Sequence, residues 1–287
     1  MKPRLKGVDK LKEKLPMLRG PKVLIMPVFL LGVILFVYYF LSLFDSFPSR
    51  FKSEDVVAAL YPFLGNSLAL IISGFAVWQM WLWRDKLKAK YGQLSYQKIF
   101  FSGFYGIVSL IFLSTHSYFP LRQFAQSYWD NSPLNFLVTP LDTFFSMYNV
   151  YINTVRYLCW LIFLIIGIAI ILRALNVFGI DYMGVVYLYF PEESEIQNNR
   201  IYSVMRHPTY AGLIYISLSG FFYQFTIYSF GSFLLTWAYF SFHVHFIEEK
   251  ELLQRFGEGY KNYMKSTPAF FVNPKKVGTL LKFILKG

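Results

Sequence analysis

Uncharged runs separated by short charged segments dominate the pattern of hydrophobic and polar positions along the chain. Three runs are close to the roughly 20 residues that a helix needs to cross the hydrocarbon core of a bilayer: 23–44, 63–83 and 99–121. A fourth run, 157–172, is shorter, but the flanking Arg156 and Arg173 can extend to opposite interfaces. The run 208–247 has no Asp, Glu, Lys or Arg and is about twice as long as one crossing. We predict about six transmembrane helices, with a tight turn within 224–231 joining the last two.

The basic residues indicate how these helices are oriented. Most of the 28 Lys and Arg residues lie in four segments: 1–22, 84–98, 173–207 and 248–287. The others lie in or beside the alternate connections: Arg50, Lys52, Arg122 and Arg156. Because basic residues in short loops are retained in the cytoplasm, this distribution predicts that both termini are cytosolic. The net charge of +12 is then mainly a topology signal, helped by attraction to anionic lipid.

Composition points to a single membrane domain of the all-α class, a polytopic helix bundle. The chain is 55% hydrophobic and only 15% charged, which is outside the usual range of soluble globular proteins. We divide it into a basic cytosolic segment at 1–22, about four transmembrane helices with a long outer loop at 23–175, and a C-terminal catalytic region at 176–287. We expect that last region to hold a cytosolic loop, two transmembrane helices and a cytosolic tail helix.

Two connections are long enough to have structure of their own. The outer one, 122–155, is aromatic and is broken by Pro133 and Pro140, which favours a re-entrant or interfacial helix. The inner one, 176–206, contains the stretch VVYLYF between glycines and acidic residues. This pattern favours a loop or a short hairpin lying across the membrane face.

Several other classes of protein and site are disfavoured. The basic N-terminal segment is longer than that of secretory signals and no small-residue cleavage site follows, so a signal anchor is favoured. No basic stripe with interleaved aromatic residues occurs outside the helix flanks, which argues against nucleic-acid binding. Cys159 is the only cysteine, so an intramolecular disulfide and a cysteine-based metal site are excluded. We expect no metal.

The residues with the clearest chemical signal lie at the start of the fifth predicted helix, in the stretch RHPTYAG. Pro208 suits the first turn of a helix, and its ring disfavours helical backbone in His207. Arg206 and His207 therefore lie just outside a helix N-terminus, where unpaired N–H groups attract anions. Gly212, one turn further, allows another helix or a ligand to approach closely.

An acidic and aromatic segment follows the sixth predicted helix. Because the fifth and sixth helices form a hairpin, Glu248 and Glu249 lie on the same membrane face as the start of the fifth. His245, four residues before Glu249, can share its helix face and hydrogen-bond with it. Tyr260 and Tyr263 would line one side of an amphipathic tail helix.

Together these two blocks resemble a known enzyme family. R-H-P-x-Y-x-G at 206–212, followed by E-E-x-x-L-x-x-x-F-G-x-x-Y-x-x-Y-x-x-x-x-P at 248–268, is similar to the pattern of the isoprenylcysteine carboxyl methyltransferases and their phospholipid methyltransferase relatives. The resemblance implies a multi-pass integral membrane enzyme that binds S-adenosylmethionine at cytosolic helix ends. A lipophilic acceptor, a prenylated cysteine or a phospholipid, would reach it from the bilayer. The membrane would be the endoplasmic reticulum in a eukaryote or the plasma membrane in a prokaryote.

The resemblance also implies roles for individual residues. The carboxylate of the cofactor suits the helix N-terminus and Arg206, and its sulfonium suits the face of Tyr210. Its amino group and ribose hydroxyls suit Glu248 or Glu249. We assign catalytic roles to Arg206 and His245, with Arg206 holding either the cofactor or the acceptor. The expected cofactor-binding residues are Tyr202, Arg206, His207, Pro208, Tyr210, Gly212, Glu248, Glu249, Tyr260 and Tyr263.

One departure from the family pattern bears on the acceptor. The isoprenylcysteine enzymes resemble one another in having arginines just before the double glutamate, where this chain has His243, Val244 and His245. This difference disfavours a carboxylate acceptor. A lipid amine or another small lipophilic acceptor is left open.

Two other functions compete with the methyltransferase. Sterol reductases resemble this C-terminal block but use NADPH, whose 2′-phosphate would call for extra Lys or Arg near the pocket. The inner loop offers mainly acids instead. A transporter or scaffold predicts ionisable residues within the helices, and apart from the histidines there are almost none. The sequence therefore favours the methyltransferase.

Overall fold

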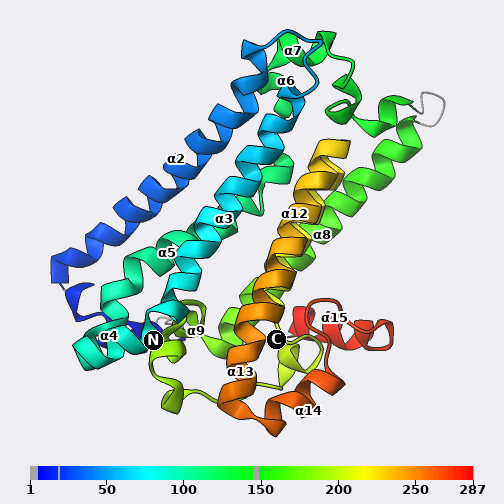
Figure 1. Cartoon of the computed structure of the whole chain (residues 1–287). Helices are drawn as coiled ribbons and strands as arrows, with labels where there is room; N and C mark the ends of the chain where they lie inside the picture. The colour runs from blue at the N-terminus through cyan, green and yellow to red at the C-terminus, as the bar shows by residue number, and fades with distance from the viewer. Residues whose placement is uncertain (1–5, 19, 145–148, 287) are drawn as a thin grey trace.

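The described part of the chain is helical throughout. The structure, a computed structural model, describes residues 6–18, 20–144 and 149–286, and the regular elements in these ranges are all helices (Figure 1). Four of them, with the short turns that flank them, are long and apolar enough to cross a membrane. They are α2 (Ile25–Ser46), α3 (Tyr61–Leu82), α5 (Ser95–Leu113) and α8 (Asn149–Phe178). The first four predicted helices are thus confirmed as helices, and α8 extends well beyond 157–172.

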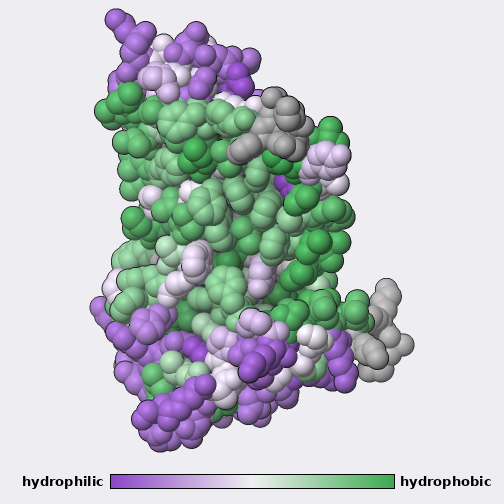
Figure 2. Space-filling model, turned by 90° about the vertical axis from the view of Figure 1, so that its right-hand side faces the viewer, coloured by the Kyte–Doolittle hydropathy of each residue, from purple (hydrophilic) through white to green (hydrophobic). Residues whose placement is uncertain are grey.

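The surface has the layering that a membrane protein requires. Figure 2 shows an apolar band between two polar ends. On α2 and α8 the band consists of exposed apolar side chains, such as Val28, which is 72% exposed, and Ile165, which is 56% exposed. A soluble monomer rarely exposes a contiguous apolar area of this extent, whereas lipid tails satisfy it.

The last two apolar helices form the predicted hairpin. α11 (Pro208–Gln224) and α12 (Ile227–His243) are each 17 residues long and pack against one another. Phe225 turns the chain with a left-handed backbone (φ 52°), and Thr226 caps α12 through reciprocal hydrogen bonds with Ser229. The turn falls within 224–231, as the sequence predicts.

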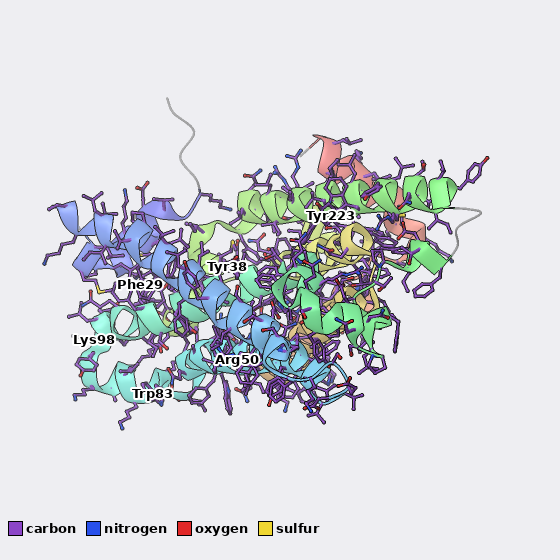
Figure 3. All side chains as sticks on the ribbon, turned by 90° about the horizontal axis from the view of Figure 1, so that it is seen from above. Phe29, Tyr38, Arg50, Trp83, Lys98 and Tyr223 are labelled. Carbon is purple, nitrogen blue, oxygen red and sulfur yellow. The ribbon has the colours of Figure 1, made fainter. Side chains whose placement is uncertain are left out.

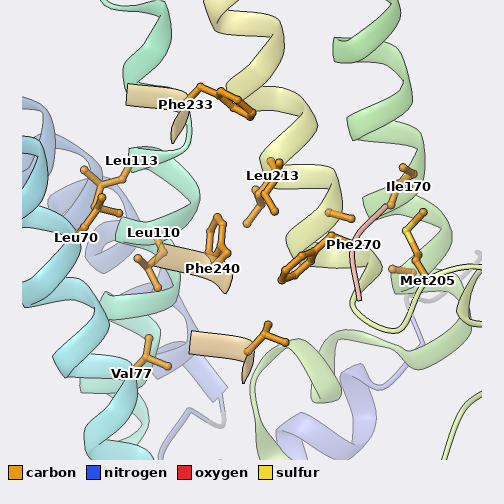
Figure 4. Packing of buried hydrophobic residues seen from close by; sticks show 14 of the residues in the cluster. Leu70, Val77, Leu110, Leu113, Ile170, Met205, Leu213, Phe233, Phe240 and Phe270 are labelled. Atoms are coloured by element: carbon orange, nitrogen blue, oxygen red, sulfur yellow. The ribbon is translucent and has the colours of Figure 1, made fainter. Parts of the chain in front are cut away.

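The long helices are arranged in two groups. α3 packs against α2 and α5, while α8 packs along α11, which in turn packs against α12. Seen from above, Trp83 lies with the first group and Tyr223 lies beside α8 in the second (Figure 3). The groups meet through buried apolar side chains, including Leu110 of α5, Leu213 of α11 and Phe240 of α12 (Figure 4). Burial of this apolar surface holds the two groups together.

Glycine allows α8 and α11 to approach closely. A Cβ atom on Gly212 would lie 2.5 Å from the side chain of Ile171 and 2.7 Å from the carbonyl oxygen of Gly167. Small residues at such crossings let helix backbones pack by van der Waals contact. Of the two uses that the sequence leaves open for Gly212, the structure shows the helix contact.

A buried polar pair links α2 to the turn after α5, within the first group, at the end of the bundle where α6 (Leu121–Phe124) lies. His116 is 1% exposed, and its Nε2 is 3.2 Å from Oδ2 of the fully buried Asp45 at the end of α2. The ring of Tyr228, from α12, packs with its centroid 5.9 Å from that of the imidazole. Because an unpaired buried charge is strongly destabilising, Asp45 and His116 are stable as a pair.

Removing one member of this pair should destabilise the protein more than removing both. Asp45→Leu or His116→Leu leaves an unpartnered buried polar group, and we expect each to reduce the free energy of unfolding by about 3 kcal/mol. The double replacement leaves an apolar contact and should be less destabilising than either single one. Melting temperatures of the three variants in detergent check this order. Additive losses would show that the two side chains do not act as a pair.

The connections differ in part from the predictions. In the outer connection the residues up to 144 form short helices, such as α7 (Gln126–Asn131), residues 145–148 lie outside the described ranges, and 149–155 belong to α8. In the inner connection the hairpin alternative is wrong, because VVYLYF lies in and around the helix α10 (Val186–Tyr189). All four side chains of α10 are buried. The stretch therefore has no alternation of buried and exposed residues with a period of two, which is the pattern that identifies a half-buried strand.

The basic N-terminal segment lies at the other end of the bundle. α1 (Val8–Lys14) packs on α9 (Ile180–Met183), and Lys10 and Lys14 each lie 2.8 Å from a carboxylate oxygen of Glu193. α9 is at the same end as the C-terminal helices (Figure 1): α13 (Glu249–Phe256), α14 (Glu258–Ser266) and α15 (Val277–Lys286). Polar and basic segments thus gather at one end of the molecule.

Candidate active site

The two helix groups enclose a cavity of about 220 Å³ at the end where α9, α13 and α14 gather. Toward the bundle interior its wall is apolar and comes from α3, α5, α11 and α12: Val77, Ile107, Leu110, Leu213 and Phe240. Toward the polar end its wall carries ionisable and aromatic side chains: Tyr182, Tyr202, His207, Tyr210, Glu248 and Tyr260. A ligand with an apolar part and a polar part would match this lining.

Most of the expected site residues gather at this cavity. Those that line it are Tyr202, Arg206, His207, Pro208, Tyr210, Glu248, Tyr260 and Tyr263. Three others lie elsewhere. Gly212 packs on α8, Glu249 is buried in an ion pair, and His245 faces outward with 69% of its side chain exposed. His245, expected to be catalytic, therefore lies outside the cavity.

Arg206 joins three segments and has no free guanidinium edge toward a ligand. Its Nε and Nη2 donate to Oε1 of Glu249 at 3.0 and 2.6 Å, and its Nη1 donates to the carbonyl oxygens of Met264 and Thr267. Its backbone N–H donates to the carbonyl of Pro268 at 2.9 Å. Arg206 thereby connects the start of α11 to the start of α13 and the end of α14. The anion expected beside the N-terminus of α11 is the protein's own Glu249.

His207 lies between the two glutamates. Its Nε2 is 3.2 Å from Oε1 of Glu249 and its Nδ1 is 3.4 Å from Oε1 of Glu248. The hydroxyl of Tyr260 is 3.4 Å from the same Nε2. Burial by itself lowers the pKa of this imidazole, but the two carboxylates outweigh burial and raise the pKa of His207 to about 9. His207 is therefore a cation at neutral pH.

The adjacent glutamates have different surroundings. Glu249 is 4% exposed, and although burial raises the pKa of its carboxyl, His207 and Arg206 outweigh burial and hold that pKa below its ordinary value. The side chain of Glu248 is 25% exposed, and His207 likewise lowers its pKa against the effect of burial. Its Oε2 has no hydrogen-bond partner among the described residues. Glu248 is therefore the carboxylate that a ligand in the cavity can reach.

An irregular turn places Glu248. Between α12 and α13, Val244–Glu248 forms a π-helical turn, in which hydrogen bonds connect residues five apart. In an α-helix, residues 243 and 248 would be about 140° apart around the axis. The wider turn brings them toward one face, and His243 and Glu248 both line the cavity.

The sequence prediction missed His243 and the inner connection. His243 is 2% exposed and lines the cavity, although it is not among the expected site residues. From the other side, Phe178, Tyr182 and Tyr187 line the cavity and stack in series, with ring centroids 3.9 and 3.7 Å apart. His243 follows Thr236 by seven residues and shares its helix face, but the burial of that face is seen only in the structure.

No protein-family model matches the chain, and searches of curated proteins and of solved structures found no significant match. The cavity and its side chains are therefore the basis on which a function can be proposed.

Arg206, His207 and Glu249 form a buried ion cluster, and we expect it to stabilise the protein less as the pH rises above neutral. The folded protein raises the pKa of His207 from its ordinary value of 6.5 to about 9. The stabilising contribution of protonated His207 is therefore complete below pH 6.5 and is lost as the pH rises through about 9. We expect the melting temperature to fall between about pH 7 and about pH 10, and His207→Gln to flatten that decline. His245→Gln, which removes an exposed imidazole 4.0 Å from Oε2 of Glu249, is the matched control and should change the slope much less. An equal slope in His207→Gln would show that this imidazole is not the cation of the cluster.

Proposed function

We propose that this protein is an integral membrane methyltransferase that transfers a methyl group from S-adenosylmethionine to a lipophilic acceptor. The observation that carries the proposal is the cavity, which joins an apolar inner wall to a polar mouth containing His207 and Glu248. In this proposal a soluble cofactor occupies the polar mouth, and a lipophilic acceptor from the bilayer occupies the apolar wall. The blocks at 206–212 and 248–268, which resemble the isoprenylcysteine carboxyl methyltransferases, both contribute residues to this mouth and contact one another there.

The proposal includes an orientation in the membrane. α11 and α12 cross the bilayer together with the four longer helices, since 17 residues span about 25 Å and the π-helical turn extends α12 further. The mouth of the cavity lies at the end that carries the lysines of α4 (Arg84–Tyr91) and α15. The excess of positive charge at that end favours the cytosolic side, in the endoplasmic reticulum of a eukaryote or the plasma membrane of a prokaryote.

The side chains of the mouth fit the groups of S-adenosylmethionine. The free oxygen of Glu248 would accept a hydrogen bond from its amino group or from a ribose hydroxyl. The N–H groups of Thr209 and Tyr210, in the first turn of α11, would donate to its carboxylate. The faces of Tyr202 and Tyr260 would stabilise its sulfonium. Methyl transfer mainly requires in-line alignment and exclusion of water, which an enclosed site supplies.

The same mouth suits NADPH less well. Two guanidinium groups line the cavity in the described ranges, and each is already paired with a carboxylate. Arg206 lies 2.6 Å from Glu249, and Arg255 lies 2.5 Å from Glu251. A 2′-phosphate would have to break one of these pairs to find a bidentate partner. A nicotinamide-dependent membrane reductase of the sterol reductase type is therefore the weaker alternative.

Calorimetry of the purified protein against S-adenosylhomocysteine and NADPH tests the proposal. S-adenosylhomocysteine is expected to bind and NADPH is not. Glu248→Gln should weaken the binding of S-adenosylhomocysteine by about tenfold or more, because a charge-assisted hydrogen bond is lost. Glu258→Gln, which changes a glutamate with 74% of its side chain exposed, is the matched control and should bind like the wild type. Binding of NADPH alone would favour the reductase, and binding of neither would overturn both enzyme assignments.

A further inference from the structure

His243 is fixed at the boundary between the apolar wall and the polar mouth. It ends α12, is 2% exposed and lines the cavity. The centroid of its ring lies 5.6 Å from that of Trp81 on α3, 5.9 Å from that of Tyr210 on α11 and 6.2 Å from that of Tyr239. Rings on three helices thus hold the imidazole in place.

The polar atoms of His243 and of the neighbouring Trp81 have no hydrogen-bond partners in the described part of the chain. Neither ring nitrogen of His243 has a hydrogen-bond partner among the described residues, and the same holds for the indole N–H of Trp81. Buried polar atoms in proteins are nearly always hydrogen-bonded. Vacant donors and acceptors beside a cavity therefore mark the place where the polar group of a ligand binds.

The charged side chains that line the cavity determine which polar group a ligand can place beside His243. Three described cations line it, and each lies against a glutamate: Arg206, His207 and Arg255. Glu248, in contrast, keeps a free carboxylate oxygen. A carboxylate acceptor would approach Glu248 without an available cation, whereas a neutral head group meets no such repulsion.

We infer that His243 is the catalytic base of the transfer and that the acceptor presents a neutral thiol or amine. The inference rests on the proposed methyltransferase function. A ring nitrogen of His243 takes the proton of the S–H or N–H group, while the sulfur or nitrogen of the acceptor bonds to the methyl carbon. The bond from that carbon to the sulfonium sulfur breaks, and its electron pair stays on the sulfur, which yields S-adenosylhomocysteine. With a thiol acceptor, the N–H of Trp81 positions the sulfur by donating to the lone pair that does not attack the methyl carbon.

The released proton has a route out of the cavity. Glu248 follows His243 around the π-helical turn, and both side chains line the same space. Oε2 of Glu248 is buried and has no hydrogen-bond partner among the described residues, so it can accept the proton, and the 25% of this side chain that is exposed belongs to its other atoms. Transfer from His243 to Glu248 and then to water returns the imidazole to its neutral form.

Three probes with the same saturated chain test the inference: dodecanethiol, dodecylamine and dodecanoic acid. The full chain in detergent is supplied with radiolabelled S-adenosylmethionine, and we expect transfer to the thiol or the amine and none to the acid. His243→Gln should lower the rate by about 100-fold or more while the affinity for S-adenosylhomocysteine stays within about threefold of wild type. His245→Gln, two residues away and exposed, is the matched control and should keep the wild-type rate. Added imidazole should restore part of the rate to His243→Ala, which a purely structural histidine would not allow.

The possible results separate the inference from the function on which it rests. Methylation of dodecanoic acid, or of none of the probes while S-adenosylhomocysteine still binds, overturns the acceptor class and leaves the cofactor assignment in place. A wild-type rate in His243→Gln overturns the role of His243. Failure of the wild-type protein to bind S-adenosylhomocysteine overturns the methyltransferase proposal, and the inference with it.

Discussion

The buried ion cluster of Arg206, His207 and Glu249 is the interaction on which the geometry of the site depends. A buried carboxylate is stable only when its charge is matched and its lone pairs are hydrogen-bonded, and two consecutive residues supply both cations here. Arg206 also binds the carbonyl oxygens at the end of α14, and the N–H of His207 donates to the carbonyl of Ala269 at 3.0 Å. One cluster therefore fixes α11, α13 and α14 relative to one another, and these helices form much of the mouth of the cavity.

This cluster gives the neighbouring Glu248 and Glu249 different roles. The carboxylate of Glu249 is paired with Arg206 and His207, which lower its pKa. It is therefore not available to a ligand. Glu248, one residue earlier, shares His207 with it but retains a free oxygen at the cavity. The π-helical turn makes this possible, because it turns Glu248 toward His243 while α13 begins at the buried Glu249. Loss of the irregular turn would alter which carboxylate a ligand meets.

The cavity lies between the two helix groups, at the end of the bundle where α9, α13 and α14 gather. At one end the turn 116–118, which follows α5, packs on α11 and α12, and in the middle the groups meet through Leu213 and Phe240. At the other end, α13 and the inner connection close over the space, where Tyr182 lines the wall. The result is an apolar interior next to charged residues. This arrangement suits the proposed reaction between a polar cofactor and a lipophilic acceptor.

The sequence by itself determined the features that depend on local order: the four long helices, the turn at 225–226, and the meeting of Arg206 and His207 with the double glutamate across a hairpin. Run length and the position of a proline are properties of neighbouring residues, so they can be read directly from the chain. Only the tertiary structure decided that His243 and not His245 faces the cavity, that Gly212 packs on α8, and that VVYLYF is helical. The first depends on a π-helical turn, which the 3.6-residue period does not describe, and the other two depend on contacts with segments far away in the sequence.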